Sequence, residues 1–171
     1  MKEEVRERAK KVRLLILDVD GVLTDRTIIL DGDRGEWKVF HVRDGTGIKM
    51  LLEAGIEVAL FSGRSSRVVE RRAKELGVGH VYQGLRDKVA PYEVLKGLLG
   101  LKDEEVCFVG DDILDIPLLQ RVGFPIVVAD GVEEAKDFAL YVTRRRGGRG
   151  AVREVCELIL RAQGKWRGSD F

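Results

Sequence analysis

The sequence is poor in cysteine and has no long apolar run, and these two absences argue against several protein classes. Its two cysteines, Cys107 and Cys156, lie in the apolar segments "VCFVG" and "VREVCELIL", where buried free thiols are favoured over a disulfide or a metal pair. No apolar stretch approaches the roughly 18 residues of a membrane span. The start, "MKEEVRERAKKVR", predicts a charged helix and lacks the apolar core of a signal peptide. Together these features favour a cytoplasmic protein that is not embedded in a membrane.

An excess of charge of either sign is also missing. The chain has 30 Lys and Arg against 29 Asp and Glu, a net charge of +1, so its field favours neither nucleic acid nor an anionic membrane as a partner.

The basic segment "TRRRGGRGAV" has no interleaved aromatic residues, which argues against a nucleic-acid patch. Two interpretations stay open for it. It is a solvated loop, or it helps to close a site in its own chain or a neighbouring one, with Gly147 and Gly148 allowing close approach.

What the sequence does have is a regular alternation of two patterns over 171 residues, a length typical of one domain. Short, nearly continuous apolar runs predict parallel strands covered on both faces, at residues 13–19, 56–62, 79–84, 105–111 and 124–129. Helical patterns occupy about 46–54, 65–76, 89–99, 114–122, 132–137 and 150–162. This alternation predicts an α/β fold, a doubly wound, Rossmann-like parallel sheet, in a single domain over residues 1–171.

One segment interrupts the alternation. Residues of about 27–42, within "RTIILDGDRGEWKVFHV", form two strand-like arms around a Gly/Asp-rich turn, which predicts a β-hairpin that projects from the sheet. The arms are apolar enough to pack on their own core or to bury against copies of themselves, since an unpaired apolar hairpin would be an aggregation risk. The tail at 163–171 is predicted to be loosely ordered.

Polar side chains gather at the ends of the predicted strands. Asp18 and Asp20 follow the first strand, Ser62 follows the second, and Lys88 opens the helix after "VYQGLRD". The strand "VCFVG" is followed by three more acids, Asp111, Asp112 and Asp115. Ligands of an open parallel sheet bind beyond the carboxyl ends of its strands, so we expect these side chains to converge.

Such a group of residues suits phosphoryl transfer. Several carboxylates at close range cannot all stay charged without a cation, and Mg²⁺ fits best because it prefers oxygen ligands and retains waters that a phosphate can replace. A carboxylate nucleophile, a second acid, a metal, a lysine and a serine are the parts that this chemistry needs. A lone Asp-x-Asp-Gly is usually only a turn, but here it comes with the other strand-end groups in order.

These residues carry a resemblance to a known family. "DVDGVLTD", "FSGR", Lys88 and "GDDILD" resemble the four motifs of the haloacid dehalogenase superfamily of phosphatases, over about Val12 to Leu160. More narrowly, "VFHVRDGTGIKML", "FSGRSSRVVERRAKELG" and "GGRGAVREVCELIL" resemble the family of 3-deoxy-D-manno-octulosonate 8-phosphate phosphatases, enzymes of lipopolysaccharide synthesis. The resemblance therefore implies a Mg²⁺-dependent phosphatase that acts on a sugar-acid phosphate through an aspartyl-phosphate.

The resemblance also assigns the catalytic and metal-binding roles. Asp18 would be the nucleophile and a metal ligand, and Asp20 the general acid and base, with its backbone carbonyl a second ligand. Asp111 would be the third ligand, and Asp115 would support the site by orienting the metal's waters or Lys88.

Two further residues would hold the phosphoryl oxygens by resemblance, namely Ser62 and Lys88. The family often has Thr at the position of Ser62, and either hydroxyl can donate a hydrogen bond. The resemblance assigns no definite role to Asp112, unlike the other acids of the cluster.

Contacts to the sugar acid follow from the same resemblance. Besides Asp20 and Lys88, they are assigned to His41, Val42, Arg43, Asp44, Gly45, Arg64 and Arg72. Arginine suits bidentate recognition of a carboxylate. The family usually has Asn where His41 stands, which loosens the assignment of the substrate.

No cap domain is expected over this site. The segments 25–61 and 62–88 are too short to hold one, so a neighbouring subunit is the natural candidate to enclose the substrate. Capless relatives form tetramers in which such hairpins meet at the centre. The resemblance thus implies a homo-oligomer, a tetramer through the hairpin.

Other functions remain open at this point. The same chemistry could act on another substrate, such as a nonulosonate 9-phosphate. A noncatalytic oligomerisation module is a second alternative, disfavoured because such a module has no need for a costly acidic cluster. A phosphotransferase or mutase would need a cap or a second substrate site, and neither is evident.

Overall fold

The computed structural model describes residues 3–32 and 35–167. The turn of the predicted hairpin at 33–34, the first two residues of the predicted N-terminal helix and the last four residues of the tail lie outside the described residues.

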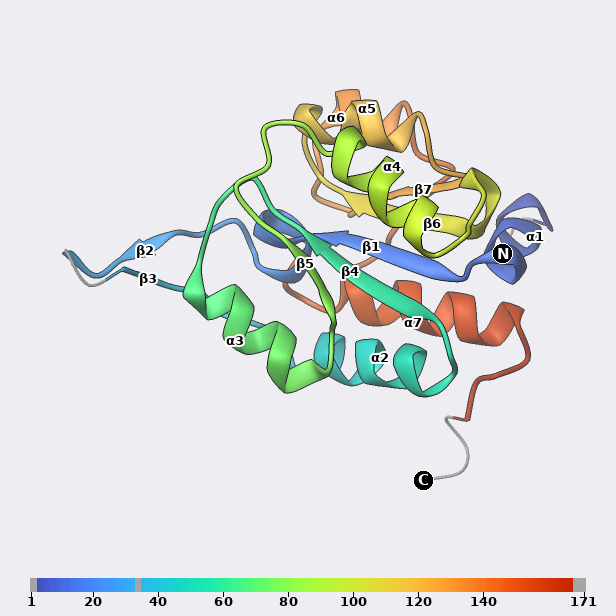
Figure 1. Ribbon diagram of the computed structural model, residues 1–171, viewed down its shortest axis with the longest axis horizontal. Coiled ribbons are helices and arrows are strands. Elements are labelled where there is room, and N and C mark those ends of the chain that lie inside the picture. Colours follow the sequence, from blue (N-terminus) through green and yellow to red (C-terminus); the bar gives the residue numbers. More distant parts are fainter. Residues whose placement is uncertain (1–2, 33–34, 168–171) are drawn as a thin grey trace.

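A six-stranded sheet, all of whose pairs are parallel, forms the centre of the molecule (Figure 1). Its strands lie in the order β5-β4-β1-β6-β7-β8. Their bounds are β1 Leu14–Asp18, β4 Glu57–Phe61, β5 His80–Tyr82, β6 Val106–Gly110, β7 Phe124–Val127 and β8 Tyr141–Val142. The five predicted strands are confirmed, whereas β8 was not predicted, because two residues are too short to show a pattern.

Helices cover both faces of this sheet. One face carries α1 Glu3–Lys11, α2 Val42–Glu53, α3 Arg67–Leu76 and α7 Ala151–Ala162, and the other α4 Val89–Leu98, α5 Ile116–Leu119 and α6 Glu133–Lys136. The central strand β1 shows how the faces are divided. Leu15 and Leu17 pack toward the first set, and Leu14 and Ile16 toward the second. Because both faces are buried, β1 is apolar at each of its first four positions and carries its one acid, Asp18, at its carboxyl end. The predicted doubly wound fold is confirmed.

The hairpin projects from one end of the sheet, as predicted, but its strands are shorter than expected. Among the hairpin residues that the structure describes, only β2 Ile29–Leu30 and β3 Glu36–Trp37 pair, in antiparallel register. The predicted second arm continues to residue 42, but Val42 is already the first residue of α2. A short apolar run such as "VFHV" does not distinguish strand from helix by its periodicity. The hairpin leaves large apolar side chains exposed, including Leu30 at 70% and Trp37 at 62%.

Three further features bear on the sequence predictions. Both cysteines are buried and free, as expected. None of the described helices is long and apolar enough to cross a membrane. Over residues 3–32 and 35–167, no cap domain covers the carboxyl edge of the sheet.

Candidate active site

The candidate site lies at the centre of the sheet, where the strands that follow β1 in the chain are placed first on one side of it and then on the other. β1 is the central strand, with β4 on one side and β6 on the other, which is the position where open α/β sheets bind ligands. Asp18 is the last residue of β1, and Asp111 directly follows β6. The predicted convergence of strand-end residues therefore occurs for these two acids.

A tight turn after β1 shapes the site. Residues Val19–Leu23 form it, and Gly21 has a positive φ of 104°. A Cβ atom at Gly21 would lie 2.0 Å from Oδ2 of Asp111, so a larger residue would be excluded by both backbone strain and contact. The turn thus places Asp20 beside the acidic groups at the end of β6.

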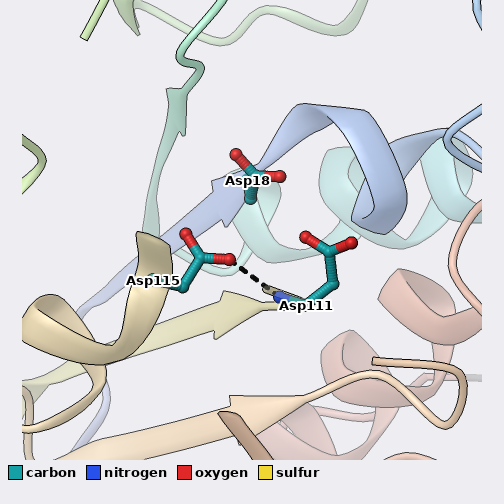
Figure 2. Close-up of side chains that lie close together, drawn as sticks. All are labelled: Asp18, Asp111 and Asp115. Atoms are coloured by element: carbon teal, nitrogen blue, oxygen red, sulfur yellow. Dashed lines mark hydrogen bonds between the residues drawn. The ribbon is translucent and has the colours of Figure 1, made fainter. Parts of the chain in front are cut away.

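Three carboxylates meet in this space. Asp18, Asp111 and Asp115 each offer an oxygen that lies within 4.8 Å of the others, and all three are buried (Figure 2). Oδ2 of Asp115 accepts hydrogen bonds from the backbone N–H groups of Asp111, at 2.8 Å, and Asp112, at 3.2 Å. Burial raises the pKa of Asp18 well above its ordinary value and that of Asp111 to about 6, although Lys88 and Arg26 oppose these shifts. The buried charges favour a compensating cation.

Lys88 supplies part of that compensation. Its Nζ lies 2.5 Å from Oδ1 of Asp18 and 2.6 Å from Oδ1 of Asp115. Burial lowers the pKa of Lys88, but the two carboxylates raise it further, so the ammonium stays charged. Lys88 and the Arg26 guanidinium, which pairs with Asp111 at 2.6 Å, provide two positive charges against three carboxylates, so negative charge remains. The remaining oxygen ligands fit a hard divalent ion such as Mg²⁺.

The cluster opens into a small hollow of about 170 Å³. It is lined by Asp18, Asp20, Gly63, Arg64, Leu85, Arg86, Lys88, Asp111, Asp112, Leu114 and Asp115. Ser62 directly follows β4 and is not among the lining residues, but its Oγ accepts a hydrogen bond of 3.2 Å from the backbone N–H of Arg64, which is. The predicted catalytic and metal-binding residues other than Ser62 thus line one space.

Most of the predicted sugar-acid contacts lie elsewhere in this chain. Asp44 is buried and accepts hydrogen bonds from the backbone N–H groups of Gly150 and Arg153, so it caps α7. Arg72 pairs with Glu75 and lies over the ring of Phe40.

His41 and Arg43 line a different, larger hollow of about 680 Å³. Val42 is exposed and Gly45 is buried. Of the arginines assigned to the sugar acid, only Arg64 lines the smaller hollow beside Asp18. The roles of the others stay predictions.

The basic loop, which carries Arg144 to Arg149, lies beside the turn Val19–Leu23. Gly148 N donates a hydrogen bond of 2.9 Å to the carbonyl of Val22, and a Cβ at Gly147 would lie 1.6 Å from the carbonyl oxygen of Gly21. The loop backbone therefore packs on the turn that carries Asp20, while Arg144, Arg145, Arg146 and Arg149 remain exposed.

A second group of residues was not found by the sequence reasoning. Lys38, next to β3, places its Nζ 2.5 Å from Oδ1 of Asp20 and 3.2 Å from Glu36. Glu36 also pairs with Arg64 at 2.8 Å. Burial by itself raises the pKa of Glu36. The hydrogen bonds from Arg64 and Lys38 outweigh this effect and lower the pKa to about 2. The hairpin segment "GEWKVF" gave no signal for these contacts, because they depend on how the hairpin folds over the turn.

Comparisons with known proteins place the chain in a family. A model of the haloacid dehalogenase-like hydrolases matches residues 36–123. The 3-deoxy-D-manno-octulosonate 8-phosphate phosphatase KdsC of Yersinia pestis is 46% identical over 167 residues, which cover 98% of this chain and 89% of that protein.

Two solved structures agree with this assignment. The crystal structure of the Yersinia pestis phosphatase has a TM-score of 0.96 at 46% identity, covering 98% of this chain and 91% of that one. The crystal structure of the Moraxella catarrhalis phosphatase, in complex with magnesium ion, phosphate ion and KDO, has a TM-score of 0.93 at 43% identity, covering 96% and 94%.

The sequence predictions of family and cofactor are thereby confirmed. The chain forms a carboxylate cluster that could hold a metal ion, and a similar protein was solved with magnesium. The chain belongs to the haloacid dehalogenase-like hydrolases and, within them, to the family of the 3-deoxy-D-manno-octulosonate 8-phosphate phosphatases.

Proposed function

We propose that this chain is a Mg²⁺-dependent phosphatase that hydrolyses 3-deoxy-D-manno-octulosonate 8-phosphate in lipopolysaccharide synthesis. The observation that carries the proposal is the bridge of Lys88 between Asp18 and Asp115, beside Asp111, at the carboxyl ends of β1 and β6. This arrangement offers a nucleophile, a cation and a metal site within one small hollow, and phosphoryl transfer depends chiefly on such positioning and charge neutralisation.

The first half of the reaction uses two carboxyl groups on one turn. A carboxylate oxygen of Asp18 attacks phosphorus in line, the new P–O bond forms, and the bond from phosphorus to the sugar oxygen breaks. Asp20, which carries a proton in this step, gives that proton to the departing sugar oxygen. The products are an aspartyl-phosphate at Asp18 and the free sugar acid.

The second half regenerates the enzyme. Asp20, now a carboxylate, takes a proton from a water molecule whose oxygen attacks the phosphorus of the aspartyl-phosphate. The bond between phosphorus and the Asp18 oxygen breaks, and inorganic phosphate leaves. Lys88 and Ser62 hold the phosphoryl oxygens in both steps. Mg²⁺ held by Asp18, Asp111 and the backbone carbonyl of Asp20, with Asp115 in support, would neutralise charge on the transferring group.

The remaining parts of the proposal concern assembly and location. The exposed apolar side chains of the hairpin favour burial against other copies of the chain, so we place the protein in a homo-oligomer, a tetramer through the hairpin. A neighbouring subunit would then enclose the open hollow.

Two buried free thiols are in keeping with a reducing, cytoplasmic compartment.

The decisive experiment is phosphate release from a panel of sugar phosphates in the presence of Mg²⁺. The panel contains the octulosonate 8-phosphate, a nonulosonate 9-phosphate and an aryl phosphate, and the control is the Asp18→Asn protein, which keeps the shape of the side chain. We expect strong preference for the octulosonate and no turnover by the variant.

Each other result has a distinct meaning. Preference for the nonulosonate would keep the chemistry and change the substrate. Turnover retained by Asp18→Asn would reject covalent catalysis by Asp18. No release from any substrate would favour a noncatalytic oligomerisation module.

A further inference from the structure

Arg26 adopts a backbone conformation that its residue type rarely adopts. Among residues 3–32 and 35–167, it is the one non-glycine residue with a positive φ, 70°. The left-handed region places Cβ close to the backbone, and L-residues other than glycine avoid it unless surrounding contacts hold them there. Strain of this kind is found at functional sites, so the contacts of Arg26 bear on what it does.

The guanidinium of Arg26 is held at three points. Its Nε donates to Oδ2 of Asp111 at 2.6 Å, its Nη2 to the carbonyl of Asp130 at 2.6 Å, and its Nη1 to Oδ2 of Asp130 at 3.3 Å. Asp130 is itself fixed, because its Oδ1 accepts a hydrogen bond of 2.9 Å from Gly147 N. The group that contacts Asp111 is therefore preorganised by the turn after β7 and by the basic loop.

The space around this pair is kept clear by Gly21. A Cβ at Gly21 would lie 2.0 Å from Oδ2 of Asp111 and 2.9 Å from Cγ of Arg26. The same turn that carries Asp20 thus accommodates both partners. Within the described part of the chain, no other side chain donates a hydrogen bond to the carboxylate of Asp111.

We propose that Arg26 is a positioning residue that orients the Asp111 carboxylate for Mg²⁺, and that its strained backbone is retained for this contact. With Oδ2 held by the guanidinium, the carboxylate cannot rotate freely, and its other oxygen stays available to the ion. A hydrogen-bonding partner holds a metal ligand in its binding orientation before the ion arrives, so less conformational entropy is lost when the ion binds. Removal of such a partner commonly weakens metal affinity about 10–100-fold. The inference rests on the metal site of the proposed function.

The test is the affinity of the metal-free protein for Mg²⁺ alone, measured by isothermal titration calorimetry. Arg26→Gln removes the charge and the fork of donors, and Arg26→Gly removes the side chain together with the backbone strain. The matched control is Arg149→Gln, because Arg149 pairs with Asp25 at 3.0 Å on the same edge of the sheet without touching Asp111. We expect about tenfold or greater weakening in both Arg26 variants and none in the control.

Melting temperatures without metal separate positioning from a merely structural role. Glycine adopts a φ of 70° without steric cost, so Arg26→Gly relieves the backbone strain at this position while it loses the contact to Asp111. Retained melting temperature with weakened Mg²⁺ binding supports the proposal, as does partial recovery of affinity in Arg26→Lys, which keeps a donor of like charge.

The outcomes that overturn the proposal are equally distinct. Unchanged Mg²⁺ affinity in both Arg26 variants rejects the role of Arg26 and leaves the proposed function intact. Tighter binding rejects it as well, because it would mean that repulsion between the guanidinium and the ion exceeds any benefit of orientation. Failure of the wild-type protein to bind Mg²⁺ overturns the metal site of the proposed function and this inference with it.

Discussion

The Nζ of Lys38 lies 2.5 Å from Oδ1 of Asp20, although the two residues are 18 positions apart in the chain. The side chain of Lys38 is only 1% exposed. A buried ammonium on the hairpin thus contacts the carboxyl group that we propose for proton transfer, so the hairpin contributes to the proposed site of its own chain.

Replacement of Lys38 by methionine should slow protonation of the leaving group. The variant keeps an unbranched side chain that is one atom shorter and removes the ammonium that contacts Asp20. General acid catalysis contributes about 10²–10⁴-fold, so we expect kcat on the sugar phosphate to fall about tenfold or more. Turnover of an aryl phosphate, whose leaving group needs less protonation, should fall less. Steady-state kinetics on both substrates measure the difference, with exposed Lys10→Met as control. Equal losses on both substrates would point to a structural role for Lys38.

Removal of the metal should stop turnover and lower stability. Asp18, Asp111 and Asp115 are buried together, and burial raises the pKa of Asp18 and Asp111 because their charged forms are disfavoured. Treatment with EDTA should therefore abolish phosphate release and lower the melting temperature, and added Mg²⁺ should restore both. Activity that is indifferent to chelation would remove the metal from the mechanism.

Glu36→Gln should have an effect on stability that depends on pH. The folded protein holds the pKa of Glu36 at about 2, below its ordinary 4.5. A carboxyl group with a lowered pKa stabilises the fold above its unfolded pKa, and this stabilisation is lost as the pH falls toward the folded value. The melting temperature of the wild type should exceed that of Glu36→Gln at pH 7, and the gap should narrow by pH 3. Exposed Glu134→Gln is the control, and a gap that is constant with pH would contradict the assignment.

The hairpin should mediate self-association. Light scattering should give a mass well above the 19.2 kDa of one chain. Trp37→Asp places a charge on the exposed apolar hairpin and should reduce that mass, because a buried unpaired charge strongly disfavours an interface. Leu98→Asp is the matched control, since Leu98 is 75% exposed but lies on α4, away from the hairpin. A monomeric wild type would defeat the proposal of a shared site.

Two glycine replacements should act in opposite directions. A Cβ at Gly147 would lie 1.6 Å from the carbonyl oxygen of Gly21, so Gly147→Ala must displace the turn Val19–Leu23 and should destabilise the fold by about 2 kcal/mol or more. Gly97 lies in α4 with no atom within 4 Å of its Cβ position, so Gly97→Ala should stabilise the protein by about 0.5–1 kcal/mol. Urea unfolding measures both, and a neutral Gly147→Ala would show that the loop and the turn are not tightly packed.

The sequence by itself determined five of the six strands of the sheet and the edge at which their polar residues gather. Continuous apolar runs flanked by helical patterns indicated parallel strands, because a strand covered on both faces is apolar along most of its length. From that, the convergence of Asp18 with Asp111 followed, since neighbouring parallel strands end at the same edge. The metal site was inferable for the same reason, as carboxylates gathered at one edge need a cation.

Only the tertiary structure decided which side chains support those acids. Lys38 and Arg26 contact Asp20 and Asp111 across 18 and 85 positions of sequence, and no local pattern marks either residue. The early start of α2 at Val42 and the strand β8 likewise depend on packing between distant segments. Local sequence sets the conformations that a segment prefers, but contacts between segments far apart in the chain are fixed only when the chain folds.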